Sequence, residues 1–261
     1  MTERKISRQM MIDALAAAFE PLPFVHAGWL GGSDASGRTD AWSDVDIQIV
    51  VDDDAAEQCF EIAREVLERL SPVTHSFRLP SPTWHGHEQE FLSLRDADPC
   101  HFIDFVVVKR SSKDWFLERE RHGDALILFD KEGLVKPPPF DRAAHTAKMQ
   151  KRFAVLREIF PLFQNLTTKA ARRRAGADAM MSYMSQTIRL VVELLRMRHC
   201  PDRYDYGLRY LDRDLPSDLR AEIERLVFPP SVDQIEAYQA RAEEIFNETM
   251  RAYDAGEWRI G

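Results

Sequence analysis

The chain has 261 residues, of which 44% are hydrophobic, and its formal net charge is −8 at pH 7. This length is sufficient for one large domain or two modest ones, with a substantial core. The negative charge argues against general affinity for nucleic acid, since phosphate binding needs a basic surface. No apolar run approaches the roughly 20 residues that a membrane-spanning helix needs, and the amphipathic N-terminal segment does not have the pattern of a signal peptide.

The three cysteines are widely spaced and form no Cys-x-x-Cys pair; they are Cys59, Cys100 and Cys200. An odd number at such spacing is typical of a reducing compartment and argues against a disulfide framework or a zinc ribbon. We therefore expect a soluble, cytoplasmic protein.

The first 136 residues alternate between helical and strand patterns. In chain order we expect a helix over 5–19, strands over 24–30 and 44–51, a helix from about 52 to 70, a strand over 73–79, a hairpin of 91–95 and 101–109, a helix over 114–121 and a strand over 125–129. The three acids at 52–54 suggest either a metal site or a helix N-terminus. We favour the helix N-terminus, where negative charge is stabilising.

Residues 136–140, Lys-Pro-Pro-Pro-Phe, form the best linker in the chain, because consecutive prolines cannot continue a helix. Strand patterns nearly vanish after this segment. The helical candidates there are 141–160, 175–199, 217–227 and 232–253. We expect two domains, an α/β domain over 1–136 and a helical domain over 137–261.

Two carboxylates, Asp44 and Asp46, stand at the start of the β-branched run that ends at Val51. Side chains two apart on a strand share one face. Burying two carboxylates side by side costs roughly several kcal/mol unless a positive charge lies between them. A divalent cation is the simplest such partner, and oxygen ligands favour Mg²⁺ or Mn²⁺ over zinc.

A third acid, Asp104, lies inside the otherwise apolar strand 101–109. A buried lone carboxylate needs a partner, which could be backbone N–H groups or an arginine. If strands 44–51 and 101–109 are neighbours, Asp104 lies beside Asp46. Three carboxylates around one point are suited to two Mg²⁺ ions at about 3.5–4 Å separation.

The pattern of Leu30, Gly31-Gly32-Ser33, a ten-residue gap and Asp44-Val-Asp46, followed by Asp104, resembles the nucleotidyltransferase superfamily that includes DNA polymerase β. The surrounding residues, Gly37 and Ser43-Asp44-Val45-Asp46, are most similar to those of the minimal aminoglycoside-type nucleotidyltransferases. The resemblance is specific over 24–52, fair at 101–108 and weak beyond 140. It implies an α/β (α+β) nucleotidyltransferase-like domain with a mixed sheet, followed by an all-helical bundle.

The resemblance also implies transfer of a nucleoside monophosphate from ATP, or another nucleoside triphosphate, to an acceptor hydroxyl. Asp44 and Asp46 would hold one Mg²⁺ ion, and with Asp104 they would hold a second. Glycines allow close backbone approach, so the turn at 31–33 would bind phosphate, helped by the Ser33 hydroxyl. An ordinary strand-to-helix turn is the alternative for 31–33, and an ordinary turn role is the alternative for Ser43.

Several accessory roles stay open. The general base could be Asp104, or one of the two glutamates Glu88 and Glu90. His85-x-His87 with Glu88 is a weak metal pattern. The candidate phosphate-binding cations are Lys169, Arg172, Arg173 and Arg174, then Lys148 and Arg152, then Arg38. The aromatic residues that could stack on a base or an acceptor, or else pack in the core, are Trp84, Trp115, Tyr183, Tyr204, Tyr206 and Tyr210.

We expect the acceptor to be a small hydroxylated molecule, such as an aminoglycoside, because an acidic surface attracts polycations. Two alternatives remain, nucleotidylation of a protein partner and a non-catalytic nucleotide-binding module. The sequence predicts neither a membrane nor a general nucleic-acid partner, and a homodimer is compatible with it.

Overall fold

The computed structural model describes residues 6–260. The chain divides into two compact units, Met1–Phe140 and Asp141–Gly261, and the division lies at the end of the proline-rich segment. No helix among the described residues is both long and apolar enough to cross a membrane.

The first unit is built on a six-stranded mixed sheet, as the sequence predicted. Its strands are β1 (Val25–Leu30), β2 (Val45–Val51), β3 (Val73–Arg78), β4 (Glu88–Leu94), β5 (Ile103–Lys109) and β6 (Leu126–Asp130). Their order across the sheet is β3-β4-β5-β2-β1-β6. β2 and β5 pair in parallel, and the other described neighbours pair antiparallel. Two strands far apart in the sequence therefore lie together at the centre.

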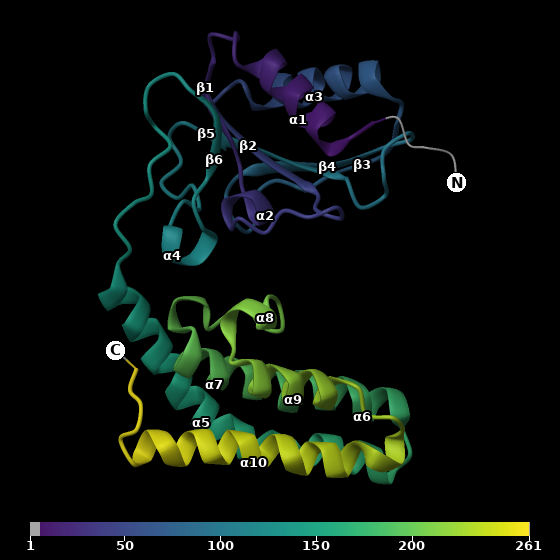
Figure 1. Ribbon diagram of the computed structural model, residues 1–261, viewed down its shortest axis with the longest axis vertical. Coiled ribbons are helices and arrows are strands. Elements are labelled where there is room, and N and C mark those ends of the chain that lie inside the picture. Colours follow the sequence, from purple (N-terminus) through teal and green to yellow (C-terminus); the bar gives the residue numbers. More distant parts are fainter. Residues whose placement is uncertain (1–5, 261) are drawn as a thin grey trace. The chain divides into compact units, whose positions relative to one another are not determined.

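Helices cover one face of this sheet. The described helices of the unit are α1 (Arg8–Phe19), α2 (Gly32–Ala35), α3 (Ala56–Leu70) and α4 (Arg119–His122). Figure 1 shows α1 and α3 side by side over the sheet. Val45, Ile47 and Ile49 of β2 are buried in the core beneath these helices. Because side chains alternate along a strand, Asp46 and Gln48 point to the opposite face, where they are partly exposed.

A smaller apolar cluster covers part of that opposite face. Trp29 and Val50 of the sheet pack there with Leu117, and Trp115 stacks on Trp29 with ring centroids 6.3 Å apart. Asp46 belongs to neither apolar cluster. The start of β2 thus carries a carboxylate on a face that is not filled by the core.

The structure corrects two local predictions in this unit. α3 begins after Ala55 without a side-chain cap, so the prediction that residues 52–54 cap it is wrong. Tertiary partners take these acids instead, since Asp52 contacts His26 at 2.7 Å and Asp53 accepts a hydrogen bond from the Ser111 backbone. The helix predicted over 114–121 is only α4, because Phe116 has a φ of 54°, which a right-handed helix does not allow.

The predicted hairpin is confirmed. β4 and β5 pair antiparallel, and Phe91 lies directly opposite Asp104. β4 begins at Glu88, three residues before the predicted start at 91. The earlier start matters for the site, because it brings Gln89 into the strand.

The second unit is all-helical over the described residues after 140. Its elements are α5 (Arg142–Arg172), α6 (Gly176–Ser182), the π-helix η1 (Tyr183–Ile188), α7 (Arg189–His199), the 3-10 helix η2 (Pro201–Arg203), α8 (Leu211–Asp214), α9 (Ser217–Val227), the 3-10 helix η3 (Val232–Gln234) and α10 (Ile235–Asp254). α5 continues through Pro161 to Arg172, beyond the predicted end at 160. Although proline weakens a helix interior, packing stabilises the part of α5 that follows it. Gln164, Thr167 and Ala171 on one face of that part are buried.

A buried ion pair organises residues 203–214 of this unit. The side chains of Arg196 and Asp214 are both fully buried and contact each other at 2.5 Å. Arg203 and Arg213 also contact Asp214, each at 2.7 Å. Their hydrogen bonds lower the pKa of Asp214, against the opposing effect of its burial. Arg196 also donates to the carbonyl of Gly207 at 2.7 Å, so one guanidinium ties this irregular segment to α7.

We predict that Asp214→Asn lowers the free energy of unfolding by about 3–5 kcal/mol, because it leaves the Arg196 charge buried without compensation. Urea unfolding at pH 7 measures this loss. Asp212→Asn, at an exposed position of the same short helix, is the matched control and should change stability by less than about 0.5 kcal/mol. Equal stabilities for the two variants would contradict the prediction.

Candidate active site

The central strand pair brings two of the three predicted acids together. β2 and β5 are in parallel register from Val45 opposite Ile103 to Val51 opposite Lys109, and Asp46 lies directly opposite Asp104. Directly opposed residues of neighbouring strands point to the same face. The prediction that these strands are neighbours, with Asp104 beside Asp46, is therefore confirmed.

The turn after β1 lies against the same carboxylate. The backbone N–H of Gly31 donates to the carbonyl of Asp46 at 2.9 Å. Gly32 has a φ of +50°, and a Cβ added to it would lie 1.6 Å from Asp46 Oδ2. Only glycine leaves room for the Asp46 side chain at this position. The Gly-Gly turn and the acid pair, separate in the sequence, form one local structure.

The two serines of the predicted site differ in how their hydroxyl groups are used. Ser33 Oγ is buried and has no hydrogen-bond partner among the described residues. A buried polar atom without a partner is costly, so it marks a place where a ligand can supply the missing bond. Ser43 Oγ instead donates to Asp40 at 3.1 Å and accepts from the Asp40 N–H at 2.9 Å. These bonds correspond to the turn role that the sequence left open for Ser43.

The charges at this place are not balanced. Burial, together with the negative charges of Asp44, Asp104 and Asp34, raises the pKa of Asp46 from 3.8 to about 7. Burial also raises the pKa of Asp104, and Asp44 adds to that effect. A raised carboxyl pKa means that ionisation is resisted until a cation arrives. Such groups are frequent at functional sites.

The donor set fits a hard divalent cation, because it consists of carboxylate oxygens with excess negative charge. Within residues 6–260, no three His, Cys, Asp or Glu side chains stand close enough to hold a metal ion as they are positioned here. Binding would therefore have to bring the carboxylates of Asp44 and Asp46 closer to that of Asp104, which Gln89 already holds. Rotation of the side chains is the simplest route, since the strand register already puts Asp46 and Asp104 side by side.

Arg8, which the sequence analysis did not single out, approaches the site from α1. Its Nε donates to the carbonyl oxygen of Asp44 at 2.7 Å, and its guanidinium forms an ion pair with Asp34. The charge of Arg8 lowers the pKa of Asp46, but the acids outweigh it. No local pattern could have indicated this contact, because Arg8 lies 36 residues before Asp44.

The two glutamates considered as general bases lie on the other face of the sheet. Glu90 is opposite Phe105, is 5% exposed and pairs with Arg64 of α3 at 2.7 Å. Glu88 precedes Gln89 in β4, so its side chain points to the face opposite that of Gln89. It contacts Lys109 at 3.7 Å. Because β4 turns these side chains away from Asp104, the general-base interpretation is wrong for both.

The histidines of the His85-x-His87 pattern do not form a metal site with Glu88, since the described residues hold no such group of three. His87 is buried, and neither of its ring nitrogens has a hydrogen-bond partner within residues 6–260. His85 Nε2 lies 2.9 Å from Gln89 Oε1, and Gln89 Nε2 donates to Asp104 Oδ1 at 2.6 Å. His85 thus contacts the third acid through an amide.

Three of the seven candidate phosphate-binding cations, Arg152, Arg172 and Arg174, have carboxylate partners inside the second unit. Arg152 contacts both carboxylate oxygens of Glu193, at 2.5 and 2.8 Å. Arg172 pairs with Glu236 at 3.2 Å, and Arg174 pairs with an acid of η3 at 3.0 Å. These pairs support the interpretation of the 169–174 run as a solvated face.

The aromatic candidates divide into core and surface residues. Trp115 stacks on Trp29, and Tyr183 is fully buried with its hydroxyl donating to the Leu226 carbonyl at 2.8 Å. These two side chains are core residues. Trp84 is 89% exposed in the loop before β4 and packs edge-on against His85.

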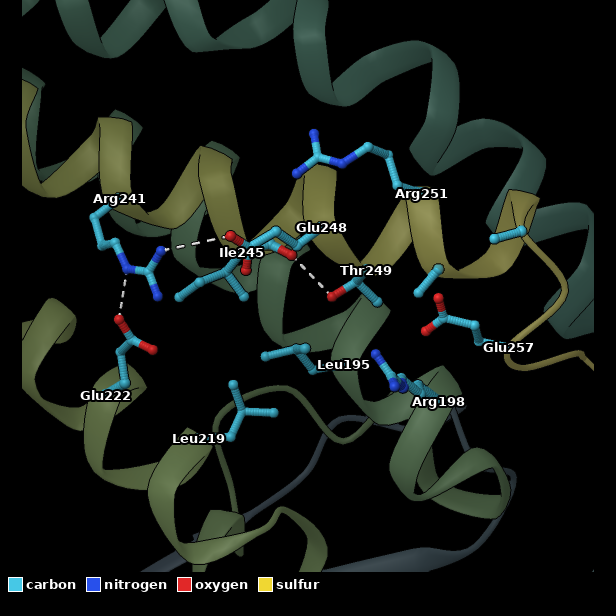
Figure 2. A pocket seen from close by; sticks show the side chains of 12 residues that line it. Leu195, Arg198, Leu219, Glu222, Arg241, Ile245, Glu248, Thr249, Arg251 and Glu257 are labelled. Atoms are coloured by element: carbon cyan, nitrogen blue, oxygen red, sulfur yellow. Dashed lines mark hydrogen bonds and ion pairs between the residues drawn. The ribbon is translucent and has the colours of Figure 1, made fainter.

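The second unit has a cavity of about 490 Å³ lined by residues of α7, α9 and α10 (Figure 2). Its floor is apolar, with Leu195, Leu219 and Ile245. Arg241 at its edge is held by Glu222 at 2.6 Å. None of the residues predicted for the active site lines this cavity.

Comparison with known proteins found no matching family and no curated relative. Among solved structures, the chain is similar to an aminoglycoside 6-adenyltransferase from Bacillus subtilis, with 12% identity and a TM-score of 0.36 over 96% of this chain and 91% of that one. It is also similar to the spectinomycin adenyltransferase AAD(9) from Enterococcus faecialis, solved with ATP and spectinomycin, with 14% identity and a TM-score of 0.35 over 90% and 99% of the two chains. The case for a function therefore rests on the residues described above.

We predict that the metal-free protein loses stability as the pH rises between about 4 and 7. Folding raises the pKa of Asp46 to about 7, so in this window the folded protein binds more protons than the unfolded chain. Asp46→Asn stays neutral and should weaken this decline, so in EDTA at pH 8 it should melt above the unaltered protein. Thermal unfolding at pH 4, 6 and 8 measures the difference. Asp54→Asn, at an exposed position, is the control, and identical pH profiles for the two variants would contradict the assignment.

We predict that Gly32→Ala destabilises the protein by about 1–3 kcal/mol more than Gly37→Ala does, because of overpacking. Both positions have positive φ and share that cost, but a Cβ at Gly37 meets nothing within 4 Å, whereas at Gly32 it meets Asp46. Urea unfolding of the two variants measures the difference. Equal losses would mean that the Asp46 carboxylate does not occupy the position described.

Proposed function

We propose that the first unit transfers a nucleoside monophosphate, AMP from ATP by default, to a hydroxyl group of a small-molecule acceptor. The observation that carries this proposal is the register that sets Asp46 opposite Asp104 beside the Gly31-Gly32-Ser33 turn. A cluster of carboxylates that raise one another's pKa, next to a turn with a buried hydroxyl that has no partner among the described residues, fits a triphosphate and its divalent cations. A phosphate alone would be repelled.

Asp44, Asp46 and Asp104 would hold the cations. When bound, two Mg²⁺ ions neutralise the charge of the triphosphate and lower the pKa of the acceptor hydroxyl. The carboxylates of this chain set where the positive charge is held, and so orient the α-phosphorus for in-line attack. Burial is the main cause of the raised pKa of Asp46, and the negative charges of its neighbours, which add to the rise, favour cation binding here.

Ser33 would donate its hydroxyl to a phosphate oxygen and thereby gain the hydrogen bond that it lacks among the described residues. Gly31 and Gly32 would let the backbone approach the triphosphate closely. Asp104 remains the candidate general base, since Glu88 and Glu90 lie on the other face of the sheet. Ser43 is given no phosphate contact, because its hydroxyl is bonded to Asp40.

The acceptor class follows from charge. The chain has a formal net charge of −8, and complementary charge raises the rate of encounter with a polycation. We therefore propose a hydroxylated, positively charged acceptor such as an aminoglycoside.

The deciding experiment is a screen of aminoglycosides and uncharged polyols with labelled nucleoside triphosphates, scored by product mass and pyrophosphate release. A product heavier by one nucleoside monophosphate supports the proposal. Label transferred only to protein would favour a protein acceptor. Magnesium-dependent binding of ATP in calorimetry with no product from any acceptor would favour the non-catalytic alternative.

We predict that Asp44→Asn and Asp46→Asn each lower turnover by more than about a hundredfold, because each removes charge stabilisation from the reacting phosphate. Asp104→Asn should lower kcat more than it raises the KM for nucleotide, since it serves the acceptor side. Pyrophosphate release under saturating nucleotide measures these effects, and Asp54→Asn is the control. Turnover within threefold of the unaltered protein for Asp104→Asn would exclude it as the third ligand.

A further inference from the structure

A chain of three hydrogen bonds ends on the carboxylate of Asp104. His85 Nε2 lies 2.9 Å from Gln89 Oε1, and Gln89 Nε2 lies 2.6 Å from Asp104 Oδ1. The backbone N–H of His87 donates to His85 Nδ1 at 3.2 Å. All four residues belong to β5, β4 or the loop that precedes β4.

The direction of each bond follows from its neighbours. His85 Nδ1 accepts the His87 N–H, so in the neutral ring the proton is on Nε2 and is donated to Gln89 Oε1. With its oxygen accepting from His85, the Gln89 amide must direct its NH₂ group to Asp104. Each residue thus fixes the orientation of the next, and the last acceptor is Asp104 Oδ1.

We propose that His85, acting through Gln89, is a positioning residue that holds the Asp104 carboxylate in place for cation binding. This inference rests on the proposed function. The Gln89 amide donates a hydrogen bond without adding a full positive charge, so it orients Asp104 without replacing the cation. Gln89 also counteracts the rise in the pKa of Asp104 that burial causes.

An ion pair would serve a structural acid better. Three arginines surround Asp214 in the second unit, whereas Asp104 receives an amide that is itself held by a second side chain. This difference indicates that Asp104 is held in one orientation while its negative charge is left to bind a cation. Hydrogen-bond partners of this kind typically contribute tenfold to a hundredfold in metal affinity or activity.

The test compares Gln89→Met and His85→Phe with two matched controls, Gln58→Met on the exposed face of α3 and His75→Phe on exposed β3. We expect both site variants to weaken Mn²⁺ binding in calorimetry, and to lower kcat, by about tenfold or more. The KM for ATP should stay within about twofold and the thermal midpoint should match the controls. Site variants that behave as their controls do, or that lose activity only in proportion to lost folded protein, would overturn the proposal.

A second readout does not depend on turnover. In nuclear magnetic resonance of the nucleotide-free protein, the Gln89 side-chain amide should shift in Asp104→Asn and in His85→Phe, and the His85 ring should carry its proton on Nε2. A Gln89 amide signal that is unchanged by both substitutions would overturn the proposed positioning role of His85 even in an active enzyme. If no acceptor is found for the unaltered protein, the proposed function fails, while the amide shifts and Mn²⁺ affinities still decide the positioning role.

Discussion

The parallel pairing of β2 with β5 is the constraint on which the site depends. It sets Asp46 beside Asp104, an arrangement that two carboxylates resist unless something compensates them. The helix-facing residues of the two strands, such as Ile47 and Phe105, hold this register because they are buried in one core. A slip by one residue would expose that core and bury the acids. Hydrophobic packing on one face therefore stabilises an electrostatically unfavourable arrangement on the other.

The surroundings of these acids orient them without cancelling their charge. Arg8 pairs with Asp34 and donates to the backbone carbonyl of Asp44, and Gln89 gives Asp104 a neutral donor. Asp214 of the second unit, in contrast, is paired with positive charges. Three guanidinium groups contact Asp214 and lower its pKa, whereas neighbouring acids and burial raise that of Asp46. The ion pairs of Asp214 stabilise the fold, whereas the negative charges around Asp46 favour the binding of a cation.

Local patterns predicted most of the elements but not their exact limits. The β-branched run at 44–51 and the apolar run at 101–109 were sufficient to predict both strands, and the all-helical character after residue 140 was visible from the loss of strand patterns. α5 was predicted too short, because Pro161 is a strong local signal that packing along the helix overrides. The acids at 52–54 were assigned to a helix cap, because a sequence cannot show that His26 and Ser111 lie beside them.

The sequence by itself determined the acids and their spacing, and predicted that Asp44 and Asp46 share one face of a strand, although β2 begins only at Val45. It also specified the glycine that the turn needs. Only the tertiary structure decided that Asp104 is the neighbour of Asp46, that Gly32 leaves the space for its carboxylate and that His85 reaches the site through Gln89. These contacts join segments far apart in the chain, and strand register and packing set them where no local periodicity can.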